Sequence, residues 1–293
     1  MHDLGGGLLT PLSVRVKAAD DNLGVKPSQR RNATLKRAIL GESNQMAAPK
    51  LSERRVSQRY TLVQESNYGH VVFEKSIVLP MMDISYGGFS VAIDKPEHES
   101  LCETLPRSSE VDLVMLGVGT TGRAIRVFEG KHRLGYAFCH DTASVLIFLR
   151  RFIEFMRMGE HLNVLDKNVL KPPYDSNEWL CFRGDGPTDV LLHASRSDAN
   201  VVDEAVVTYR EKETYRTAEL RTGRLLTSIA SENNLTTGQR GAQDAQANED
   251  ILRKASCILM GYRQICDTAH QALLDNALVT FRKSLLSNPA KNK

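Results

Sequence analysis

The segment Asp83-Ile84-Ser85-Tyr86-Gly87-Gly88 leads directly into an apolar run over residues 89–93. Asp, Ser and Gly favour turns for steric and hydrogen-bonding reasons, and the run that follows has the composition of a β-strand. The segment also places a carboxylate and a hydroxyl beside glycines, where another molecule can approach the backbone closely. Alone, it predicts a turn between strands.

Alternating apolar segments extend outward from this turn. Each is short and rich in strand-forming residues; they cover residues 60–63, 71–78, 89–93, 111–116, 123–128 and 134–138. Six short strands at this spacing predict a small antiparallel β-barrel. Residues 142–158 are predicted to form a helix, with Asp141 or Thr142 as its cap. Its apolar positions recur at helical spacing: Leu146, Leu149, Phe152, Ile153 and Met156.

A second polar segment, Arg55-Val56-Ser57-Gln58-Arg59, lies about two dozen residues before the turn. It sets two guanidinium groups four residues apart, and Arg54 adds a third cation. Planar guanidinium groups match phosphate oxygens and purine edges in bidentate geometry. An R-x-x-x-R segment alone is typical of a solvated surface. Its combination with the later carboxylate and hydroxyl, on a six-strand pattern, favours a binding site for a doubly charged guanine nucleotide.

The two segments together resemble the PilZ family, which is marked by R-x-x-x-R before the barrel and by D/N-x-S-x-x-G on the following sheet. The resemblance covers residues 51–159. It implies a six-stranded barrel followed by a helix, and a receptor for the bacterial second messenger cyclic di-GMP. It also implies that phosphates and guanine faces contact Arg55 and Arg59, and that guanine edges meet Asp83, Ser85 and Gly88. We add Arg54 to this ligand-binding set.

Four regions are predicted along the chain: a flexible basic arm over residues 1–50, the barrel over 51–159, a linker over 160–177 and a second α+β domain over 178–293. Residues 1–59 carry a surplus of six positive charges, although the whole chain has a net charge of +3. Because these charges are dispersed and no aromatic residue lies between them, nucleic-acid binding is not expected.

The second domain resembles no family that we can name. Strands are predicted over residues 179–182, 190–193, 205–209, 215–220 and 225–229, with a helix over 201–226 as an alternative. One long helix is predicted over 249–287. Its apolar positions fit a helix on its own sheet, or a seam that contacts a second copy or another protein.

Several classes of protein and site are not expected. Hydrophobic residues make up 41% and charged residues 25%, as in an ordinary soluble protein. The longest strongly apolar run, 145–149, is too short to span a bilayer, and no signal peptide is evident, so we expect a cytoplasmic protein. The cysteines are scattered, without metal-ligand spacing. The G-x-G-x-x-G at 117–122 lies between short strands, which predicts a hairpin rather than a dinucleotide site.

The expected output is a conformational change read by a protein partner through the second domain, without catalysis and without a cofactor. Two alternatives stay open. One is an adaptor that binds no nucleotide. The other is an enzyme in the second domain, for which Asp185, Asp189 and His193 are the available acids and histidine.

Overall fold

A computed structural model describes residues 58–62, 68–93, 105–139, 143–231 and 242–286, and every structural statement below refers to these residues. They all belong to one compact unit. The predicted arm, Arg54, Arg55 and the predicted cap at Asp141 or Thr142 lie outside the described residues. Within them, no helix is both long enough and apolar enough to cross a membrane.

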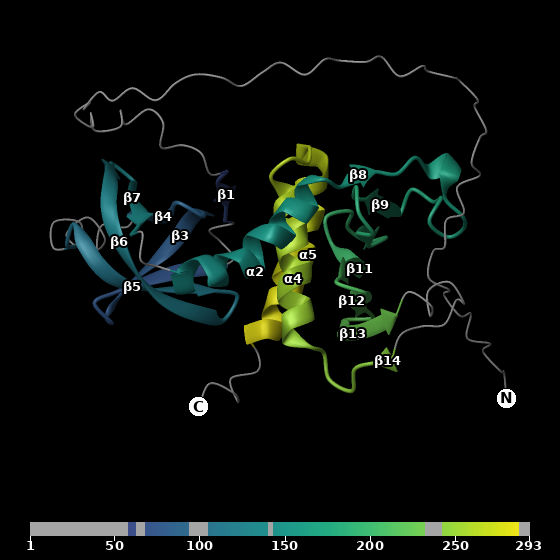
Figure 1. The fold of residues 1–293 in the computed structure, drawn as a ribbon. Helices are drawn as coiled ribbons and strands as arrows, with labels where there is room; N and C mark the ends of the chain where they lie inside the picture. Colours follow the sequence, from purple (N-terminus) through teal and green to yellow (C-terminus); the bar gives the residue numbers. More distant parts are fainter. Residues whose placement is uncertain (1–57, 63–67, 94–104, 140–142, 232–241, 287–293) are drawn as a thin grey trace, which may run out of the picture. The chain divides into compact units, whose positions relative to one another are not determined.

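The first sheet is a closed antiparallel barrel of six strands, as predicted (Figure 1). It closes because β3 pairs with both β2 and β4. The short β1 pairs with β3 outside the ring of six. In chain order the strands are β1 (Tyr60–Thr61), β2 (Gly69–Phe73), β3 (Ile77–Ser85), β4 (Gly88–Ala92), β5 (Ser108–Met115), β6 (Val118–Gly130) and β7 (Arg133–Phe138).

Two of the predicted barrel strands need correction. Residues 71–78 are not one strand: they span the end of β2, a turn and the start of β3. Glu74 and Lys75 make this turn with φ angles of 50° and 61°. The predicted strand at 60–63 is β1, which lies beside the barrel, and β3 takes the sixth place. As a consequence, Asp83 and Ser85 lie within a strand instead of in a turn.

The G-x-G-x-x-G segment forms a hairpin, as expected. Leu116 and Gly117 connect β5 to β6 with φ angles of 48° and 79°. Positive φ at both central residues is the geometry of a tight two-residue hairpin turn. No helix begins here: Gly117 is in the turn, and Gly119 and Gly122 are paired within β6.

The helix α2 (Ala143–Glu160) follows the barrel. Four of the five predicted apolar positions are buried, whereas the Leu146 side chain is 45% exposed. Helix α2 packs on α4 (Glu249–Arg263) from the distant end of the chain. Gly159 and Gly261 bring the two helix backbones together, because a Cβ added to either glycine would lie within 2.0 Å of a backbone oxygen of the other helix.

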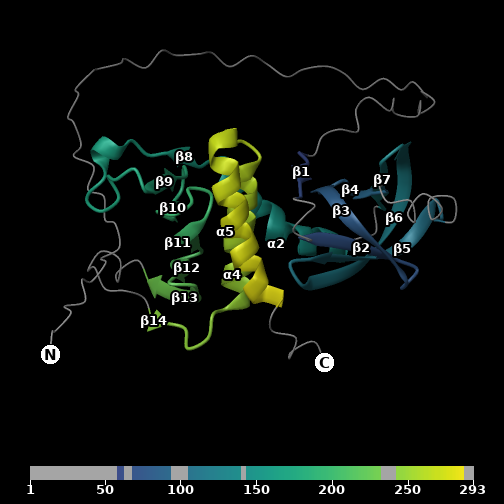
Figure 2. The same ribbon diagram turned by 180° about the vertical axis from the view of Figure 1, so that it is seen from behind.

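The second sheet is an antiparallel meander whose seven strands are neighbours in sequence order (Figure 2). This arrangement confirms the predicted strands and rules out the helix considered over residues 201–226. The strands are β8 (Asn163–Val164), β9 (Trp179–Arg183), β10 (Asp189–Ala194), β11 (Val202–Glu211), β12 (Thr214–Arg221), β13 (Arg224–Ser231) and β14 (Ala242–Gln243). The residues predicted as a linker contain β8 and the 3₁₀ turn η3 (Lys167–Val169). Leu170 packs there with Trp179 and Cys181.

The predicted long helix over 249–287 is two helices, α4 and α5 (Thr268–Leu286), which pack on each other and contact β11 or β12 (Figure 1). Five of the seven residues of the predicted seam are buried within this chain, whereas Cys266 is partly exposed and Ala269 is exposed; the buried ones are Leu252, Ala255, Leu259, Tyr262 and Leu273. Most of the seam is therefore used to pack α4 and α5 within this chain, against α2, each other and the second sheet. This arrangement favours the first of the two readings of the seam over a contact with a second copy.

Candidate functional site

A β-bulge places Asp83 on the outer face of the barrel. Met81 pairs with Val91 and Asp83 pairs with Ser90, so Met82 has no opposite residue. A bulge shifts the in-and-out alternation of a strand by one residue. Met81 and its partner therefore face the core, whereas Asp83 and Ser90 share the opposite face.

Both oxygens of the Asp83 carboxylate are engaged. Arg59 Nη1 lies 2.5 Å from Oδ1, and the Ser90 hydroxyl donates a 2.6 Å hydrogen bond to Oδ2. Arg133 Nη1 lies 3.5 Å from Oδ2. Asp83 is only 6% exposed. A carboxylate that is this buried is stable in its charged form only when it is paired and hydrogen-bonded, and these three partners meet that need.

The Ser85 hydroxyl donates a 3.1 Å hydrogen bond to the Gly88 carbonyl oxygen, across the turn that joins β3 to β4. Gly88 lies directly against β7: a Cβ added there would be 2.0 Å from the Tyr136 carbonyl oxygen. Ser85 and Gly88 therefore fix the turn and the β4–β7 contact. Ser85 and Gly88 thus determine the course of the backbone that follows Asp83.

The segment that carries Arg59 is anchored on both sides. The Tyr60 hydroxyl donates a 3.1 Å hydrogen bond to Glu160 at the end of α2, and Gln58 also donates to that carboxylate. Burial, followed by the negative charge of Glu160, raises the pKa of the Tyr60 hydroxyl, which keeps it a donor. On the other side of Tyr60, the backbone of Thr61 is bound by Gln264.

Gln264, the residue after α4, binds the Thr61 backbone through both ends of its side-chain amide. Its Nε2 donates to the Thr61 carbonyl oxygen at 2.9 Å, and its Oε1 accepts from the Thr61 N–H at 3.2 Å. These two hydrogen bonds, one donated and one accepted, have the pattern that a neighbouring β-strand would make with Thr61. We call this contact the Gln264 clasp. It joins the Arg59 segment to the end of α4.

The structure thus brings together four of the six residues that the sequence predicts for the site: Arg59, Asp83, Ser85 and Gly88. The other two, Arg54 and Arg55, lie outside the described residues. Sequence reasoning missed Ser90 and Arg133. Ser90 carried a signal, because it is a polar residue in an otherwise apolar strand, whereas Arg133 carried none that we can identify.

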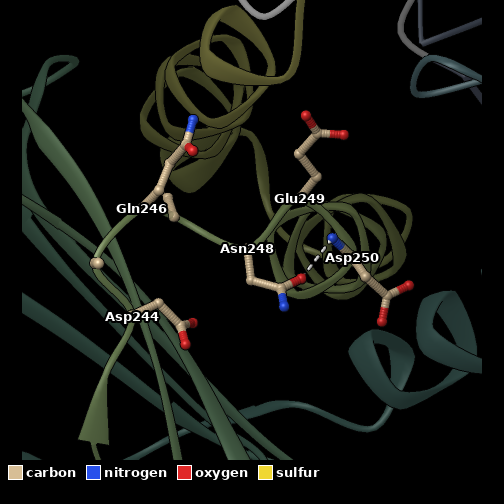
Figure 3. Close-up of a pocket in the computed structure, with 7 residues that line it drawn as sticks. Asp244, Gln246, Asn248, Glu249 and Asp250 are labelled. Carbon is tan, nitrogen blue, oxygen red and sulfur yellow. Dashed lines mark hydrogen bonds between the residues drawn. The ribbon is translucent and has the colours of Figure 1, made fainter. Parts of the chain in front are cut away.

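The hollow at the start of α4 is unsuited to a nucleotide (Figure 3). It measures about 460 Å³ and is lined by residues 244–250, which include Asp244, Glu249 and Asp250. Asn248 caps α4 by accepting hydrogen bonds from two backbone N–H groups. Three carboxylates around a small hollow repel a doubly charged anion, so a phosphate ligand is not expected there.

Asp185, Asp189 and His193, the residues considered for catalysis, each contact a different partner. Asp189 forms an ion pair with Arg183 at 2.7 Å, and His193 Nε2 lies 3.4 Å from Glu178. Asp185 lies 3.1 Å from His161. Among the described residues, no cluster of three or more His, Cys, Asp or Glu side chains could hold a metal ion, and the four cysteines form no disulfide.

No protein-family model matches the chain, and no curated protein matches it. Two solved structures are similar to it at low identity. An uncharacterized Legionella protein, Lpg0364, has 12% identity and a TM-score of 0.27, over 34% of this chain and 98% of its own. The Borreliella burgdorferi PlzA protein, solved in complex with c-di-GMP, has 9% identity and a TM-score of 0.26, over 72% of this chain and 96% of its own.

Proposed function

We propose that this chain is a cytoplasmic receptor for cyclic di-GMP and acts without catalysis. The proposal rests on the ion pair between Arg59 and the buried carboxylate of Asp83, on the outer face of a six-stranded barrel. The two residues come from the separate halves of the PilZ-like pattern. A guanidinium and a carboxylate together offer complementary groups for a phosphate and a guanine edge.

Binding in this site is an exchange of partners. In the structure Arg59 pairs with Asp83, so a nucleotide must draw the guanidinium to its phosphates and leave Asp83 for the guanine edge. Arg54 and Arg55 would contribute further cations from the preceding segment. The exchange moves the segment at 58–61, which Glu160 and Gln264 hold. The output would then be a change at α2 and α4 that a protein partner reads.

Calorimetry on the full chain tests the proposal. We expect cyclic di-GMP to bind with a Kd in the micromolar range or tighter, roughly 8 kcal/mol or more, and GTP and cyclic AMP to bind far more weakly. Arg59→Ala should weaken binding by about 1.5 to 3 kcal/mol, because a charge-assisted hydrogen bond is lost. The matched control is Arg224→Ala, an exposed arginine on β13, which should bind as wild type does.

Two results would point elsewhere. A folded wild-type chain that gives no heat with cyclic di-GMP and no competition would favour the adaptor that binds no nucleotide. Equal losses in Arg59→Ala and Arg224→Ala would show that the nucleotide binds through general charge and not at Asp83.

A further inference from the structure

Arg133 is a second cation at Asp83, and it comes from the barrel itself. It begins β7 opposite Ala92, two residues along β4 from Ser90, so it shares the outer face with Ser90 and Asp83. Its side chain is 45% exposed and its Nη1 lies 3.5 Å from Asp83 Oδ2. Arg59, in contrast, contacts the other oxygen, Oδ1. The two guanidinium groups therefore occupy separate oxygens.

The Arg133 side chain packs on the aromatic ring of Phe128. Its guanidinium carbon lies 5.5 Å from the centre of the Phe128 ring, within cation–π range. Phe128 is 50% exposed and pairs across the strands with Gly135. A Cβ at Gly135 or Gly130 would come within 3.0 Å of Phe128. Two glycines thus leave room for an aromatic ring on the outside of the barrel, and Arg133 lies over that ring.

We infer that Arg133 is a positioning residue that keeps the charge of Asp83 compensated when Arg59 moves to the ligand. The inference rests on the proposed function. Once Arg59 leaves, Arg133 is the cation that still lies beside Asp83. Without Arg133 the carboxylate would keep the neutral hydroxyl of Ser90 but no cation from these partners, and a buried carboxylate without a cation is strongly unfavourable. Arg133 can remain, because it begins a barrel strand and packs on Phe128.

Titrations of the full chain with cyclic di-GMP separate this role from others. Arg133→Ala should weaken binding tenfold or more, whereas Arg133→Lys should stay within about threefold, because a lysine retains the positive charge. Arg224→Ala again controls for the loss of one exposed charge. Thermal unfolding measured without added nucleotide should change little in Arg133→Ala, since Arg59 pairs with the other oxygen of Asp83.

A double-mutant cycle with Asp83→Asn gives the sharper readout. Asn is neutral and needs no cation, and it is the other residue that the D/N-x-S-x-x-G pattern accepts. Adding Arg133→Ala to Asp83→Asn should therefore weaken binding by less than threefold. A residue with a merely structural role would lower affinity equally in both backgrounds.

The outcomes are distinct. If wild type does not bind cyclic di-GMP, the proposed function and the role of Arg133 both fall. If wild type binds and Arg133→Ala binds equally well, only the role of Arg133 falls. Equal losses in the Ala and Lys variants, or a tenfold loss that persists in the Asp83→Asn background, would also overturn it, because charge compensation predicts neither.

Discussion

At the scale of single residues, the β-bulge at Met82 determines which side chains surround Asp83. Met82 has no partner on β4, and this places Asp83 with Ser90 on the outer face. The sequence identified Asp83 because its motif is local. Ser90 and Arg133 reach the carboxylate only through the register of β4 and β7, which a motif does not contain. They belong to the site for reasons that appear only once the strands are paired.

Gly88 provides a test at this scale. We expect Gly88→Ala to lower the free energy of unfolding by about 1 to 3 kcal/mol or more, because overpacking in a well-packed region costs that much. The added Cβ would lie 2.0 Å from the Tyr136 carbonyl oxygen, an atom of the backbone that cannot simply rotate away. Urea denaturation measures the change. Gly186→Ala is the control, since a Cβ there meets nothing within 4 Å, and equal stability of both variants would contradict the expected contact.

At the scale of elements, the strand pattern predicted most of the barrel and the second sheet, and the errors have a common cause. The turn between β2 and β3 uses Glu74 and Lys75 at positive φ, where Gly or Asn is usual. The break between α4 and α5 falls at residues 264–267, which contain neither Gly nor Pro. Both changes of direction therefore lack the residues that ordinarily signal them.

The crossing of α2 and α4 gives the second prediction on stability. Alanine is ordinarily favoured over glycine in a helix by up to about 1 kcal/mol. At Gly159, however, a Cβ would lie 2.0 Å from the Ile258 carbonyl oxygen of α4. We therefore expect Gly159→Ala to destabilise the chain by about 1 to 3 kcal/mol in urea denaturation, and Arg151→Ala on the exposed side of α2 to change it little. A more stable Gly159→Ala variant would mean that the helices do not meet at this residue.

At the scale of the whole molecule, the barrel and the second sheet are joined by more than the chain between them. Helix α2 packs on α4, and Arg253 of α4 donates a 2.9 Å hydrogen bond to the Leu116 carbonyl oxygen in the β5–β6 turn. The sequence divided the chain at 160–177 because composition changes there. It could not show that residues far apart, such as Thr61 and Gln264, are in contact.

The Gln264 clasp is expected to transmit ligand binding to the end of α4. In wild type, cyclic di-GMP should change amide hydrogen exchange both at residues 58–62 and at 261–267, because the Arg59 segment is bonded to Gln264. Gln264→Ala should abolish the second change while the Kd stays within about threefold. Gln271→Ala on α5 is the control. An unchanged response at 261–267 in Gln264→Ala would show that the signal takes another route.

The Gln264 clasp also bears on how copies of this chain behave toward one another. β1 pairs with β3 on one side, and the Thr61 backbone N–H and carbonyl group on its other side are occupied by the glutamine amide. Unpaired backbone groups along a strand edge are a template for strand addition by another chain. A chain without Gln264 would leave these two backbone groups of Thr61 open to a strand from a neighbouring copy, although the shortness of β1 limits how far such pairing could extend.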